Sequence, residues 1–173
     1  MKWMNIRLSA IATAFLFLWL RIQGASLITS TSPRGIVDLE LAETPTRVNE
    51  LISVWNKTIV TNNILIDFLF IPAYALFLSL ICLQLAERFK VQFLSNAGPL
   101  IARGIWLAAI LDLVENSLML VSMNGMNSIY ICQLTCWVAL IKFCWVGLAI
   151  LYLMVYLFPA LFHFTFKKKS NGE

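Results

Sequence analysis

Charged residues are scarce in this chain, and histidine is almost absent. Only 13% of the 173 residues are Asp, Glu, Lys or Arg, and the single histidine is His163. A soluble globular domain carries about 25% charged residues, so the composition argues against a soluble protein. One histidine near the end of the chain also argues against haem or a metal site built from histidine. We therefore predict no metal and no cofactor.

The cysteines are few and do not form the pattern of a disulfide or metal site. Cys82, Cys132, Cys136 and Cys144 all lie inside apolar runs. Cys132 and Cys136 would share a helix face, but neighbouring Cβ atoms on a helix lie about 5–6 Å apart. A disulfide needs a Cβ separation of about 3.8 Å. We interpret all four as small hydrophobic residues.

Hydrophobic residues make up 60% of the chain and gather in four long runs. A helix needs about 20 mostly apolar residues to cross a bilayer. The first run is the shortest, and a cleaved signal peptide is the alternative reading of it. We predict an all-α membrane protein, a bundle of four transmembrane helices with an extracytoplasmic amphipathic helix. The predicted spans are residues 6–22, 64–85, 100–121 and 129–156, within one membrane domain of residues 1–166 that is followed by a basic cytoplasmic tail, 167–173.

Basic residues indicate the orientation of the spans. They precede the first span, lie between the second and third, and follow the fourth as Lys167, Lys168 and Lys169. Four alternating spans place all of these residues on one side, which the positive-inside rule makes the cytoplasmic side. We expect a multi-pass protein of the plasma membrane, or of the inner membrane if the chain is bacterial, with both termini in the cytoplasm. The net charge of +4 then reflects topology, and we expect no nucleic-acid partner.

The longest connection between spans contains a predicted amphipathic helix over residues 45–60. Thr44 and Pro45 have the pattern of an N-cap followed by proline at the first helical position. Apolar residues then recur with helical spacing on one face. These residues are Val48, Leu51, Ile52, Trp55 and Ile59. We expect the helix to lie on the membrane or over the mouth of the bundle, with a simple connector as the alternative.

The third predicted span is interrupted by polar residues within the stretch "ILDLVENSLM". Asp112, Glu115 and Asn116 are three and four residues apart, so they share a helix face. Gly104 and Ala108 are small residues four apart on the same helix, which allows a neighbouring helix to come close. We therefore expect the polar face to point toward protein and not toward lipid.

Other spans carry charges at a similar depth, counted at about 1.5 Å per residue. We predict that Lys142 of the fourth span pairs with Asp112 near the midplane. Arg21, at the outer end of the first span, is predicted to pair with Asp67 or Glu115. A single charge at the centre of a span costs about 2.5–3.5 kcal/mol, so pairing or protonation must offset it.

Three functions remain open for this polar cluster. In the first, which we favour, a binding or transport-accessory protein holds an ion, a proton or a lipid headgroup in a pocket open to the outer side, lined in part by Tyr74 and Tyr130. In the second, a structural or assembly subunit uses the polar residues for helix packing, within the chain or against a second copy or another membrane protein. The third is a membrane-embedded enzyme acting on lipid, with Asp112 and Glu115 as acid and base. We lean against an enzyme, because no nucleophile with a base and no metal set is visible.

Short motifs also occur in a recognisable order: "GIVDLELA" in the outer loop, "DFLFIPAY" in the second span and "LDLVEN" in the third. They resemble the "ElA-T", "lDylFi-aY" and "DllEN" motifs of a family of small, mostly bacterial four-helix membrane proteins. The resemblance covers roughly residues 35–122, with no matching motif in the fourth span. It implies a shared fold and a shared polar cluster, and no activity. It indicates Glu40, Asp67, Tyr74, Asp112, Glu115 and Asn116 as positions of interest, and together with Lys142 and Arg21 these are the predicted ligand-binding residues.

Overall fold

A computed structural model describes the backbone of residues 2–170 and the side chains of residues 4–158. Within this part of the chain every regular element is a helix. The elements are α1 (Lys2–Gln23), the 3-10 helix η1 (Ala25–Leu27), α2 (Val37–Glu40), α3 (Pro45–Val54), α4 (Lys57–Ala86), α5 (Gln92–Met123) and α6 (Ile129–Ser170).

Four of these helices are long and apolar enough to cross a membrane. They are Met4–Gln23, Lys57–Ala86, Gln92–Met123 and Ile129–Phe158, counted over the described residues. The predicted all-α class and the predicted four-helix bundle are thereby confirmed. Helix boundaries differ from the prediction between α3 and α4. The predicted single helix to residue 60 is interrupted at Trp55 and Asn56. The Asn56 side chain accepts hydrogen bonds from the backbone N–H groups of Thr58 and Ile59 and so caps α4.

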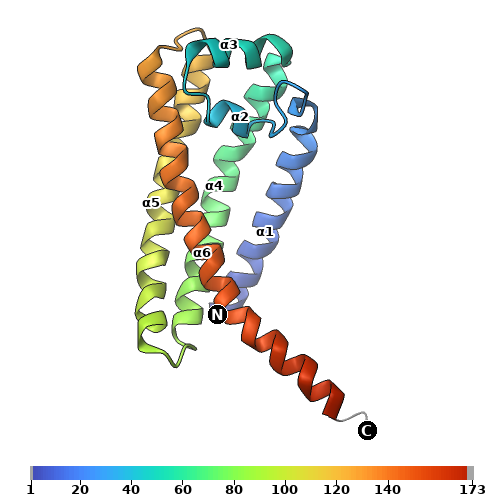
Figure 1. Ribbon diagram of the computed structural model, residues 1–173, viewed down its shortest axis with the longest axis vertical. Helices are drawn as coiled ribbons and strands as arrows, with labels where there is room; N and C mark the ends of the chain where they lie inside the picture. The colour runs from blue at the N-terminus through green and yellow to red at the C-terminus, as the bar shows by residue number, and fades with distance from the viewer. Residues whose placement is uncertain (1, 171–173) are drawn as a thin grey trace.

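Helix α4 lies at the centre of the bundle. It packs against α1, α5 and α6, and α5 also packs along α6. Helices α1 and α6 diverge toward the end of the bundle that carries α2 and α3 (Figure 1). This divergence decides where the cavity described below lies.

Close approach of α5 and α6 depends on Gly104. A Cβ atom added at this position would overlap the indole ring of Trp145 on α6. The small residue therefore allows a large aromatic side chain to lie against the α5 backbone. The predicted close packing along this face of α5 is confirmed.

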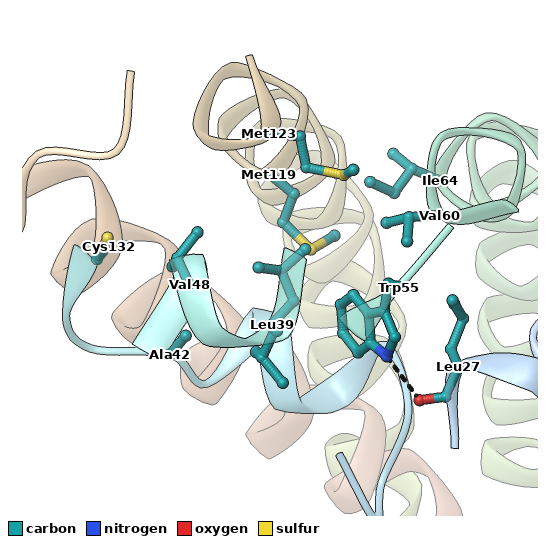
Figure 2. Packing of buried hydrophobic residues seen from close by; sticks show 11 residues of the cluster. Leu27, Leu39, Ala42, Val48, Trp55, Val60, Ile64, Met119, Met123 and Cys132 are labelled. Atoms are coloured by element: carbon teal, nitrogen blue, oxygen red, sulfur yellow. Dashed lines mark hydrogen bonds between the residues drawn. The ribbon is translucent and has the colours of Figure 1, made fainter. Parts of the chain in front are cut away.

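The segment from η1 to α3 covers one end of the bundle (Figure 1). Its anchor is Trp55, whose indole Nε1 donates to the carbonyl oxygen of Leu27 at 2.9 Å and to Ser32 Oγ at 3.0 Å. Figure 2 shows the indole among buried side chains of the cap and of α4, α5 and α6. The segment is thus a packed cap and not the simple connector considered as the alternative. We refer to residues 25–55 as the cap.

Candidate functional site

The centre of the site is Lys142, a buried lysine on α6. Its Nζ lies 3.0 Å from Asp112 Oδ1 and 2.8 Å from Glu115 Oε2, both on α5. A third carboxyl oxygen, Glu40 Oε2 of α2, lies 3.5 Å away. All four side chains are buried, and Glu115 is fully so. The predicted pairing of Lys142 with Asp112 is confirmed; we call these four residues the charged cluster.

The backbone brings these residues together in two different ways. Asp112 and Glu115 are three apart on α5 and point to the same side because of the helical repeat. Glu40 comes from the cap, where a turn at Gly35 with φ of +63° leads into α2. This left-handed conformation is one that glycine adopts readily. The cap, which lies between α1 and α4 in the sequence, therefore supplies the third carboxyl group of the cluster.

Two hydrogen bonds join α4 to the same site. The Tyr74 hydroxyl donates to Asp112 Oδ2 at 2.8 Å. Closer to the cap, one helical turn after Asp112 on α5, Asn116 Nδ2 donates to Asp67 Oδ2 of α4 at 2.7 Å. These contacts therefore involve seven of the eight predicted residues, all but Arg21. The polar face of α5 points to α4 and α6, as expected, and not to the bundle exterior.

The predicted pairing of Arg21 with Asp67 or Glu115 was wrong. Among the described residues Arg21 forms no ion pair with Asp67 or Glu115, and Glu115 binds Lys142 instead. The exposed Arg21 lies at the end of α1, where a long side chain can keep its guanidinium in a polar environment. Tyr130 was also placed wrongly. It is 81% exposed, because the first turns of α6 bury Cys132 and Cys136 and direct Tyr130 outward.

A cavity of about 270 Å³ lies beside the charged cluster. Its walls come from α1, from the segment between α1 and α2, from α2 itself, and from α4, α5 and α6. Glu40, Asp67, Asp112 and Lys142 contribute polar groups, and Arg21 also lines it. The apolar part includes Phe17, Leu20, Ile36, Phe70, Phe143 and Val146.

Sequence reasoning did not single out Phe17 and Phe143. Both line the cavity, although they are 50% and 39% exposed. Each is one of many apolar residues in an apolar run, so the sequence carries no signal that distinguishes them. Glu40 was indicated only by the resemblance, since depth counting along a span does not apply to a loop residue.

Electrostatics at the site are dominated by carboxyl groups. Glu40, Asp67, Asp112 and Glu115 are four acids beside one ammonium group, Lys142. Burial raises the pKa of the Glu40 carboxyl group, and the nearby Lys142 ammonium opposes this shift without reversing it. In the described part of the chain no three His, Cys, Asp or Glu residues are arranged to hold a metal ion. In the charged cluster, the lysine occupies the space between the carboxyl groups.

Fold and site together define a multi-pass membrane protein with a buried charged cluster. Searches against protein-family models, curated proteins and solved structures find no match for this chain, and no family is identified.

Proposed function

We propose that this protein is a membrane binding protein that holds the positively charged group of a ligand in the cavity. The observation that carries the proposal is that the carboxyl groups of Glu40, Asp67 and Asp112 line this cavity beside Lys142, which already contacts two of them and the buried Glu115. A charge inside a membrane protein is expensive unless it is paired or neutralised. The excess carboxyl groups therefore attract either protons or a cation.

Asp67 is the acid that we assign to the ligand. Its Oδ2 accepts the hydrogen bond from Asn116, and no ion pair to Asp67 occurs among the described residues. The side chain is half-buried and lines the cavity, whereas Asp112 and Glu115 already contact Lys142. An ammonium group beside Asp67 would form a charge-assisted hydrogen bond, which is stronger than a neutral one.

We place this protein in the plasma membrane, with the cavity toward the outer side and both termini inside, on the positive-inside pattern of the sequence. The resemblance to small four-helix membrane proteins is part of the same proposal. It agrees with the four packed helices and adds no activity.

One observation favours a second function, in helix packing. Glu40 and Lys142 are 102 residues apart, and their contact ties the cap to α6. On this alternative the charged cluster fixes the position of the cap, and the cavity has no ligand. A structural role predicts that conservative changes in the cluster alter the stability of the protein. It also predicts that no ligand stabilises either the wild-type protein or the variants.

The two functions differ in the behaviour of Asp67→Asn. The amide can still accept the hydrogen bond from Asn116, so the fold is retained, but the negative charge is lost. Purified wild-type protein in neutral detergent should gain thermal stability when ethylammonium chloride is added, compared with equal sodium chloride, because a ligand of the native state stabilises it. Asp67→Asn should abolish this gain.

The matched control is Glu43→Gln, which removes one carboxylate from an exposed residue of the cap. It should retain the full response to ethylammonium. If wild-type protein shows no response and Asp67→Asn changes only its stability, the packing role is correct and the binding role is not.

A further inference from the structure

We infer that the ligand is a phospholipid with a primary ammonium head group, which reaches the cavity sideways from the bilayer between α1 and α6. This inference rests on the proposed function and names the ligand class for the same site. It uses three observations: the size of the cavity, the exposure of its two aromatic walls, and the order of charges along it.

The size of the cavity fits a head group and excludes a whole lipid. Sites for drug-sized ligands usually have volumes of about 300–1,000 Å³, and this cavity has about 270 Å³. A diacyl lipid therefore fits only if its chains stay outside. The ligand must then lie across an opening, with its head group inside and its acyl chains in the membrane.

The opening is on the side of the bundle that faces lipid. Phe17 of α1 and Phe143 of α6 both line the cavity, and both are partly exposed to the exterior. They lie on the two helices that diverge toward the cap (Figure 1). Both residues belong to membrane-spanning segments, so the space outside them is acyl chain and not water. Acyl chains leaving the cavity here would contact the two rings.

Charges change sign between the rim of the cavity and its interior. Asn63 Nδ2 donates to the Leu20 carbonyl oxygen at 3.2 Å and to Gln23 Oε1 at 2.7 Å, which fixes the end of α1 against this level of α4. Arg21 lies at that level. Asp67 is one turn further along α4, about 6 Å deeper at 1.5 Å per residue.

A basic residue near the rim and acids further in match a zwitterionic head group. Its phosphate, which is attached to the glycerol, would lie beside Arg21, and its terminal ammonium would reach Asp67. Arg21 has no ion-pair partner among the described residues, so its guanidinium is available to the phosphate. Arg34 also lines the cavity, but it already binds Asp38 at 2.7 Å.

The chemistry of the acids distinguishes a primary ammonium from a quaternary one. A primary ammonium has three N–H donors, and carboxylate oxygens accept them. A trimethylammonium group carries the same charge but has no N–H donor and is larger. The site should therefore prefer phosphatidylethanolamine to phosphatidylcholine. Phosphatidylglycerol, which has a phosphate and no amine, should bind more weakly than phosphatidylethanolamine.

The experiment is a competition among these three lipids with identical acyl chains, measured by native mass spectrometry of the delipidated, detergent-purified full chain. We expect about tenfold tighter binding of phosphatidylethanolamine than of phosphatidylcholine, the ratio given by one charge-assisted hydrogen bond. Asp67→Asn should reduce that ratio to about one. Arg21→Gln should weaken all three lipids to a similar extent. Two controls outside the cavity are Arg7→Gln on α1 and Glu43→Gln on the cap. They should change neither the preference for phosphatidylethanolamine nor the affinity for the three lipids.

Two results would overturn the inference, and the response to ethylammonium decides whether the proposed function is rejected with it. Equal binding of the three lipids by wild-type protein would exclude head-group recognition. Free phosphoethanolamine that binds as tightly as the lipid would exclude a role for the side opening, because the acyl chains would then contribute nothing. A response to ethylammonium without any preference among the lipids would reject the lipid as the ligand and leave the proposed function intact. If the protein shows neither a response to ethylammonium nor a preference among the lipids, the proposed function and the lipid assignment are both rejected.

Discussion

Lys142 Nζ lies 3.0 Å from Asp112 Oδ1, and the other oxygen of the same carboxyl group accepts a hydrogen bond of 2.8 Å from Tyr74. One carboxyl group therefore joins α4, α5 and α6. Glu115 and Glu40 complete the surroundings of the lysine and add the cap to this junction. The stability of the bundle is consequently expected to depend on these few side chains.

Removal of the lysine should strongly destabilise the bundle. Lys142→Met leaves the buried carboxyl groups without their common cation, and breaking a buried ion pair on one side typically costs about 3–5 kcal/mol. We expect a loss of that order in the free energy of unfolding, measured by denaturant titration in detergent. Lys57→Met is the matched control, because Lys57 is exposed and its Nζ bonds only the Asn124 side chain among the residues that the structure describes. Equal stabilities of the two variants would show that the carboxyl groups are already neutral.

The contact of α5 with α6 gives a second prediction, from a pair of glycines. Gly104→Ala forces its new methyl group into Trp145, whereas Gly147→Ala on α6 meets nothing within 4 Å. Overpacking costs about 1–3 kcal/mol, while alanine within a helix is better than glycine by about 0.5–1 kcal/mol when its methyl group has room. Gly104→Ala should therefore lower the thermal midpoint and Gly147→Ala should raise it.

A compensating change tests the cause of the Gly104 effect. Trp145→Leu combined with Gly104→Ala should restore part of the lost stability, because the smaller side chain leaves room for the methyl group. If the double variant loses at least as much stability as the two single variants lose together, Trp145 is not the residue that Gly104 accommodates.

The number of spans could be predicted from the sequence because it depends on the length of apolar runs alone. Helix ends could not, since they depend on local caps: the Asn56 side chain starts α4 within the stretch that apolar spacing assigned to α3. Apolar spacing did predict the buried face of the cap, where Val48, Leu51 and Trp55 are all buried.

For the charged site, the sequence predicts how deep a side chain lies along its span but not the direction in which it points. Counting residues along a span gives depth, and this was sufficient to pair Lys142 with Asp112. It does not give the direction in which a side chain points around the bundle axis, so Arg21 was paired with the wrong acids. The position of Glu40 depends on how the cap folds over the bundle. That fold depends on long-range contacts such as the one between Trp55 and Leu27, which no local pattern specifies.

Orientation in the membrane is a third prediction. We expect Glu50 of the cap to lie outside and Lys90, between α4 and α5, to lie in the cytoplasm. Both side chains are exposed, so a cysteine at either position should react when reagent reaches it. In intact cells a membrane-impermeant maleimide should label Glu50→Cys, while Lys90→Cys should need permeabilised cells. Wild-type protein, with its native cysteines, gives the background, and the reverse pattern would invert the proposed topology.

The pH dependence of the cap provides the last prediction, through Glu40. Burial raises the pKa of this carboxyl group above its ordinary value of 4.5. A carboxyl group with a raised pKa stabilises the folded state most when it is protonated in both states, below pH 4.5. This contribution is lost as the pH rises through 4.5 toward the higher value of the folded state, by at most about 1.4 kcal/mol per pH unit.

Glu40→Gln should remove this slope, because the amide does not titrate. We therefore expect the free energy of unfolding of wild-type protein to fall relative to Glu40→Gln as the pH is raised from 4 to 8. Amide hydrogen exchange of α2 and α3 should show the same difference, since Glu40 joins the cap to Lys142. Glu43→Gln, an exposed neighbour in the cap, should keep the wild-type slope. Parallel curves for wild-type protein and Glu40→Gln would mean that the Lys142 ammonium fully compensates the burial of Glu40, and that protons do not compete with a cation at this carboxyl group.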